Sequence, residues 1–62
     1  MTPQEKAVEL VEKFTNLYEG INLGLAKKYW AKQSALIAVD EILKLRVNIP
    51  YWQEVKEEIE NL

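Results

Sequence analysis

The chain has 62 residues, a net charge of −2, 48% hydrophobic and 29% charged residues, which is typical of one globular domain spanning residues 1–62. Having neither cysteine nor histidine, it lacks disulfides, thiolate chemistry and the commonest general base. No apolar run approaches the roughly 20 residues of a membrane span, and the polar N-terminus is unlike a signal peptide. We therefore expect a cytoplasmic protein with no membrane partner, stabilised by helix packing or oligomerisation.

A first helix is expected from about residue 3 to residue 19. Thr2 is a good N-cap, Pro3 suits the first helical position, and Glu5 completes a T-x-x-E capping box. Apolar residues then recur at helical spacing: Ala7, Leu10, Val11, Phe14, Leu17, Tyr18 and Ile21. Gly20 predicts the end of this helix, and residues 20–24 read as a short loop.

The second helix is expected from about residue 25 to residue 45. Its centre, residues 35–39, is five apolar residues in succession, so the helix needs cover on two sides. One predicted stripe is Ala31, Ala35, Ala38, Val39, Ile42 and Leu45, whose alanines permit close helix approach. The other is Tyr29, Trp30, Leu36, Ile37 and Leu43.

A third helix is expected from about residue 50 to residue 61. Pro50 suits its first turn and Asn48 is a candidate cap. Its apolar stripe is narrow and consists of Trp52, Val55, Ile59 and Leu62. A three-helix arrangement can cover the second helix, but the chain has many large rings for so small a core: Tyr18, Tyr29, Trp30, Tyr51 and Trp52. Exposed apolar patches usually mark an interface. The predicted fold is therefore an all-α, three-helix, homo-oligomeric bundle, most simply a two-fold dimer.

Charge is unevenly distributed along the chain. Residues 25–46 carry five cations against two acids, a net of +3, whereas residues 1–24 carry −2 and residues 47–62 carry −3. We expect these segments to attract one another. Asp40 can pair with Lys44 in the same helix, or with Arg46 or a lysine from a neighbour.

A basic and aromatic cluster opens the second helix. Lys27, Lys28 and Lys32 can contact phosphate, while Tyr29 and Trp30 can stack on a base, near a helix N-terminus that favours anions. The simpler interpretation, which the pattern favours, is that the rings are core or interface anchors and the lysines their solvated rim. Packing is also the favoured role for Trp52, with stacking in an inter-subunit pocket as the alternative.

No pattern for catalysis or metal binding is present. The chain has no phosphate-binding loop, no dinucleotide fingerprint and no H-E-x-x-H motif, and its only serine, Ser34, lacks a histidine base. Asp40 and Glu41 point about 100° apart on a helix, which suits paired carboxylate catalysis poorly. The acids of the last helix, Glu54, Glu57, Glu58 and Glu60, read as a solvated face. We expect no enzyme activity, no catalytic residue, no metal and no cofactor.

Residues 2–7, 31–44 and 51–60 resemble short uncharacterised helical proteins encoded by phages and prophages of Bacteroidetes-type bacteria. The chain departs from them in its short connection before the last helix and in Ser34, which stands where that family has a cysteine. The resemblance implies an accessory protein of the infected bacterium's cytoplasm.

By analogy, such a protein would be a counter-defence sponge for an anionic nucleotide immune signal. Its ligand-binding residues would be Lys27, Lys28, Lys32 and Arg46 for phosphate, with Tyr29, Trp30 and Trp52 for the base. One alternative is a protein–protein module that inhibits a host factor. Another is a small DNA-binding accessory protein, which ranks lower because only the second helix is basic.

Overall fold

The structure, a computed structural model, describes residues 1–18 and 26–62. These residues form three α-helices and no strand: α1 (Pro3–Leu17), α2 (Lys27–Lys44) and α3 (Ile49–Glu60). The all-α class is confirmed, and the predicted helix bounds agree to within two residues. The predicted loop at residues 20–24, with Gly20, and Ile21 of the first stripe lie outside the described residues. None of the described helices has the length and apolar character needed to cross a membrane.

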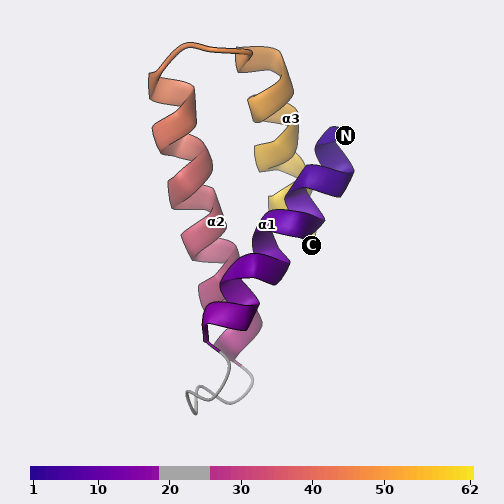
Figure 1. Cartoon of the computed structure of the whole chain (residues 1–62), viewed down its shortest axis with the longest axis vertical. Coiled ribbons are helices and arrows are strands. Elements are labelled where there is room, and N and C mark those ends of the chain that lie inside the picture. Colours follow the sequence, from indigo (N-terminus) through magenta and orange to yellow (C-terminus); the bar gives the residue numbers. More distant parts are fainter. Residues whose placement is uncertain (19–25) are drawn as a thin grey trace.

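The helices form a short hairpin with a third helix laid across it (Figure 1). α2 and α3 run antiparallel and are joined by a tight turn, and each pair of helices is in contact. The end of α1 lies beside the start of α2, and the start of α1 lies on the side of α3 (Figure 1). The Tyr51 hydroxyl donates to the Met1 carbonyl over 3.4 Å, which ties the start of α1 to α3.

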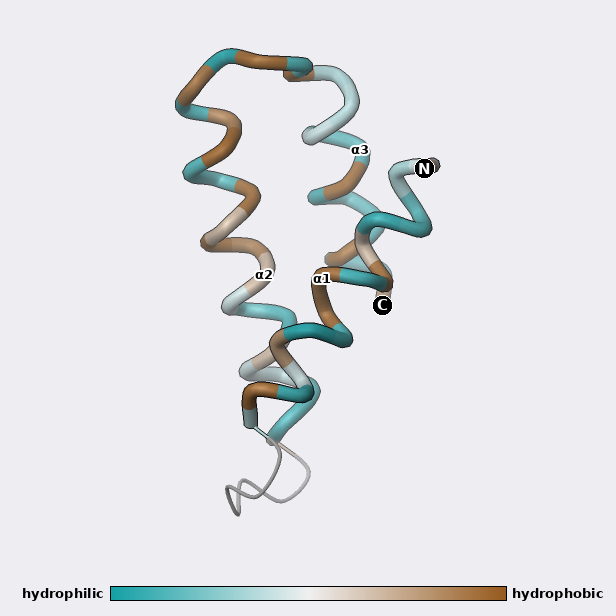
Figure 2. Tube along the Cα trace, in the orientation of Figure 1, coloured by the Kyte–Doolittle hydropathy of each residue, from teal (hydrophilic) through white to brown (hydrophobic). Residues whose placement is uncertain are grey.

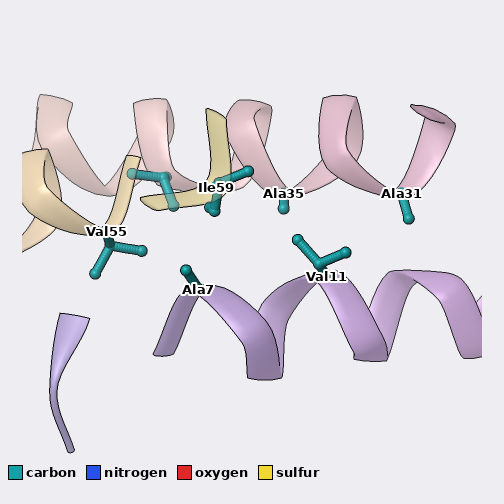
Figure 3. Close-up of a cluster of buried hydrophobic side chains, with 7 residues drawn as sticks. Ala7, Val11, Ala31, Ala35, Val55 and Ile59 are labelled. Atoms are coloured by element: carbon teal, nitrogen blue, oxygen red, sulfur yellow. The ribbon is translucent and has the colours of Figure 1, made fainter. Parts of the chain in front are cut away.

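All three helices contribute small or β-branched residues to the core (Figure 3). The buried residues are Ala7 and Val11 from α1, Ala31, Ala35 and Val39 from α2, and Val55 and Ile59 from α3. The alanines let α1 and α2 approach closely, as predicted. Half-buried larger side chains pack around this centre: Leu10, Phe14, Tyr18, Leu36, Leu43, Tyr51 and Trp52.

The predicted capping box of α1 is confirmed. The Glu5 amide donates to Thr2 Oγ1 over 3.1 Å, and the Thr2 amide donates to Glu5 Oε1 over 2.9 Å. The hydrogen bond from the Thr2 backbone lowers the pKa of the Glu5 carboxyl. The ionised Glu5 carboxylate therefore stabilises the start of α1 more than its protonated form would, because a carboxylate is the better hydrogen-bond acceptor.

The turn between α2 and α3 differs from the expectation. Asn48 is the N-cap of α3, but its side chain makes no cap hydrogen bond and its backbone is left-handed, with φ 50°. Arg46 is left-handed as well, with φ 58°. A left-handed residue reverses the chain directly after α2. The backbone conformation of Arg46 and Asn48 therefore forms the turn, without a side-chain cap.

Four parts of the predicted apolar stripes are exposed in the structure, and one of them is Leu62, which follows the end of α3 and is 37% exposed. Leu17 is 68% exposed because it lies about 90° around α1 from the line of Ala7 and Val11. Leu45 is 71% exposed because it follows the last turn of α2. On α2, Tyr29, Trp30 and Ile37 of the second stripe are exposed, whereas Leu36 and Leu43 pack against the core. Within the described residues, α2 is therefore covered on one side only.

Candidate functional site

The first two turns of α2 form the candidate site, which we call the basic–aromatic end: Lys27, Lys28, Tyr29, Trp30 and Lys32. Tyr29 is 57% exposed and Trp30 is 48% exposed, and neither belongs to the core. Their rings meet edge to face, with centroids 5.4 Å apart and planes at 77°. Two large rings are thus presented together on the surface of the described part of the subunit.

The lysines of the basic–aromatic end project in different directions. Residues two apart on a helix are about 200° apart, so Lys28 and Trp30 leave α2 on nearly opposite sides. Lys32 follows Tyr29 by almost one turn and shares its side. Lys32 Nζ donates to the Glu60 carbonyl over 3.3 Å, at the end of α3 where unpaired carbonyls and the helix dipole favour a cation. One lysine of the cluster therefore has a structural role.

A hydrogen bond fixes the basic–aromatic end against α1. The Tyr18 hydroxyl and Ser34 Oγ are 2.7 Å apart and half-buried. Ser34 lies one turn after Trp30 on α2, so the bond sets the position of this end of the helix. The sequence identified Ser34 only as an isolated serine, because a side-chain pair sixteen residues apart leaves no local signal.

The two other predicted ligand residues, Arg46 and Trp52, lie at the opposite end of the bundle. Arg46 follows α2 and is exposed, and the helical rise places it about 24 Å from Trp30 along the axis. Trp52 is half-buried against the core and meets Tyr51 edge to face at 5.2 Å and 88°. The seven predicted ligand residues therefore form two separate groups in one subunit. Trp52 packs against the core, which is the role that the sequence favoured for it.

Of the partners expected for Asp40 of α2, the structure shows a lysine from a neighbouring helix. Asp40 Oδ1 lies 3.1 Å from Lys56 Nζ on α3, and Lys44 Nζ pairs with Glu41 Oε1 at 3.1 Å. The predicted bond between Asp40 and Lys44 is absent, and a lysine from a neighbouring helix takes its place. The contact between α2 and α3 thus pairs an acid from the net-basic segment 25–46 with a lysine from the net-acidic segment 47–62. Both partners are about half exposed, so the pair contributes under about 1 kcal/mol.

The described residues enclose no pocket, and they contain no cluster of acidic side chains that could hold a metal ion. The basic–aromatic end is therefore an open surface in the described part of one subunit. No known protein family, curated protein or solved structure matches this chain. The geometry of the basic–aromatic end offers ring faces for stacking and ammonium groups for anions.

Proposed function

We propose that the protein is a non-enzymatic, homo-oligomeric binding protein that captures an anionic nucleotide at the basic–aromatic end of α2. One observation carries the proposal: Tyr29 and Trp30 are adjacent and about half exposed, at an end of α2 that also carries the exposed Lys28 on the side away from Trp30. Stacking of one base on an aromatic ring contributes about 1–3 kcal/mol, and lysine adds attraction for phosphate. The resemblance noted above makes a phage counter-defence sponge in the bacterial cytoplasm the specific form of this proposal.

A second subunit is needed for a site of this kind. Small-molecule sites usually bury most of the ligand surface, whereas the described residues of one subunit offer an open face. Apolar side chains beyond the rings support self-association, since Ile37, Leu45 and Val47 are all well exposed. An oligomer would supply the opposite wall of the nucleotide site.

Calorimetry against a panel of cyclic and linear dinucleotides tests the proposal. We expect micromolar or tighter binding of at least one compound, weakened at least tenfold by Trp30→Ala and by Lys28→Gln. Lys13→Gln is the matched control, because it removes an exposed ammonium from α1 and should leave binding unchanged. Absence of heat across the panel at micromolar protein would contradict the proposal.

A protein–protein module that inhibits a host factor is the second candidate. It is favoured by the exposure of Ile37, Leu45 and Val47, apolar side chains that a nucleotide does not require. A pulldown from bacterial lysate with wild type, Ile37→Glu and Leu17→Glu distinguishes the candidates. A stoichiometric host protein that is lost only with Ile37→Glu would support this second function.

A further inference from the structure

One line of side chains on α2 faces away from the core along most of the helix. Trp30, Ile37 and Lys44 follow one another at intervals of seven residues, and seven residues fall only about 20° short of two full turns. The line lies on the side of α2 opposite the buried Ala35. Trp30 is 48% and Ile37 65% exposed, so no described part of the chain covers this outer line.

We propose that the outer line of α2 pairs antiparallel with the outer line of a second copy, about a two-fold axis at Ile37. The partner subunit then completes the nucleotide site at each end of the pair. The part of this inference that concerns the ligand rests on the proposed function. The pairing rests only on the exposure and the charges of the outer line.

Charge complementarity decides the direction of the pairing. A parallel pair would set Lys44 against Lys44 of the partner subunit and Glu41 against its own copy, which is repulsive. In the antiparallel pair Trp30 meets Lys44 of the partner subunit, a cation over a ring face. The Gln33 amide meets Asp40 of the partner subunit, whose carboxylate can accept a bond beside the one from Lys56. The first half of the outer side thus carries donors and a ring, and the second half carries acceptors and a cation.

The apolar surface is large enough for a specific interface. Tyr29 and Trp30, each about half exposed, offer roughly 200 Å² of ring surface. Ile37, Leu45 and Val47 extend the apolar surface to the α2–α3 turn, where Figure 2 shows hydrophobic stretches alternating with hydrophilic ones. A patch of roughly a few hundred Å² is the size that marks an interface, and a polar rim supplies the rest of the ~800 Å² that each partner of a stable dimer buries.

Pairing in this direction brings one of the two separated ligand residues, Arg46, to the basic–aromatic end of the partner subunit. Lys28 and Arg46 each lie nine residues from Ile37, so Arg46 of the partner subunit comes to the height of Lys28. Each end of the pair then gathers cations around the rings: Lys44 and Arg46 of the partner subunit come to the height of Tyr29 and Trp30, while Lys28 lies on the opposite side of α2 from Trp30. Because like charges repel, this arrangement favours a ligand that carries phosphate between them. The two-fold axis predicts two such sites in each dimer.

Cysteine cross-linking tests both the contact and its direction, because the chain contains no other cysteine. Under mild oxidation, Ile37→Cys should form a covalent dimer at the two-fold axis, whereas Gln33→Cys should not, since its two copies lie about 12 Å apart along the axis. A disulfide requires Cα atoms within about 7 Å. Efficient cross-linking of both variants would indicate a parallel pair and overturn the proposal. Leu17→Cys, on exposed α1 surface, is the matched control and should form no covalent dimer.

Sedimentation combined with dinucleotide titration separates the pairing from the ligand. Wild type should sediment at twice 7.2 kDa at micromolar concentration, Ile37→Glu at 7.2 kDa with unchanged helical circular dichroism, and Leu17→Glu as wild type. Ile37→Glu should also bind the panel at least tenfold more weakly. A wild-type dimer that binds no dinucleotide would contradict the proposed function and leave the pairing intact. A wild-type monomer that binds one would overturn the pairing.

Discussion

Two tyrosine–tryptophan pairs occupy the same place in two helices and have different surroundings. Tyr29–Trp30 and Tyr51–Trp52 are the third and fourth residues of α2 and α3. Both pairs meet edge to face, with centroids 5.4 Å and 5.2 Å apart. Yet the first pair is about half exposed and the second packs against the core. The local sequence sets the arrangement of the rings, and the rest of the helix decides whether they are buried.

Helical phase explains the difference. Trp52 lies seven residues before the buried Ile59, which places both on the same side of α3. Trp30 lies nine residues before the buried Val39, half a turn away, which places it on the opposite side of α2. The half-buried pair is also tied to the residues that precede α1, through the hydrogen bond between Tyr51 and the Met1 carbonyl. Exposure of Tyr29 and Trp30 thus follows from the position of the core stripe.

The largest expected contrast is in stability. Trp52→Ala should lower the free energy of unfolding by about 2–3 kcal/mol, because a half-buried ring leaves a void against the core. Trp30→Ala should cost under about 1 kcal/mol at concentrations where the chain is monomeric, because its ring lies on the surface. Urea unfolding of both variants measures the difference. Equal losses would show that the first pair is as much part of the core as the second.

A smaller effect is expected at the turn that leads into the buried pair. Arg46→Gly should raise the free energy of unfolding by about 0.5–1 kcal/mol, since glycine adopts the left-handed conformation without a Cβ penalty. Asn48→Gly is the matched control and should change stability less, because asparagine tolerates this conformation. Thermal unfolding compares the two. If Arg46→Gly also weakens nucleotide capture, the side chain and the backbone of Arg46 have separate roles.

The smallest expected effect is the loss of stability at the start of α1 at acid pH. The folded-state pKa of Glu5 is lowered by its hydrogen bonds to Thr2, so its stabilisation is complete above the ordinary carboxyl pKa of 4.5 and is lost as pH falls through the lowered value. Loosening the start of α1 should expose Tyr51 and Trp52 before it affects Tyr29 and Trp30. An acid titration of fluorescence in Trp30→Phe and in Trp52→Phe follows each tryptophan separately. A change at Trp30 that begins at higher pH than the change at Trp52 would contradict this order.

Much of the fold follows from short-range signals. The capping box at Thr2 and the proline at position 50 predict two helix starts to within one residue, and the spacing of Ala31, Ala35 and Val39 identifies the buried side of α2. The site was less predictable. Arg46 was grouped with the lysines of the basic–aromatic end although the rise per residue of one helix already separates them. The Tyr18–Ser34 bond and the pairing of Asp40 with Lys56 depend on how the helices cross, which residue spacing does not encode.

The composition of the core has a consequence for how sharply this small chain defines its native state. Each buried residue that the structure describes is an alanine, a valine or an isoleucine. Alanine has no rotamer freedom to lose, and valine and isoleucine in a helix are confined mainly to one χ1 rotamer before they pack. Ordering this interior therefore costs little side-chain entropy. A modest apolar area can then hold three helices in one arrangement, while lysine and glutamate side chains remain on the surface.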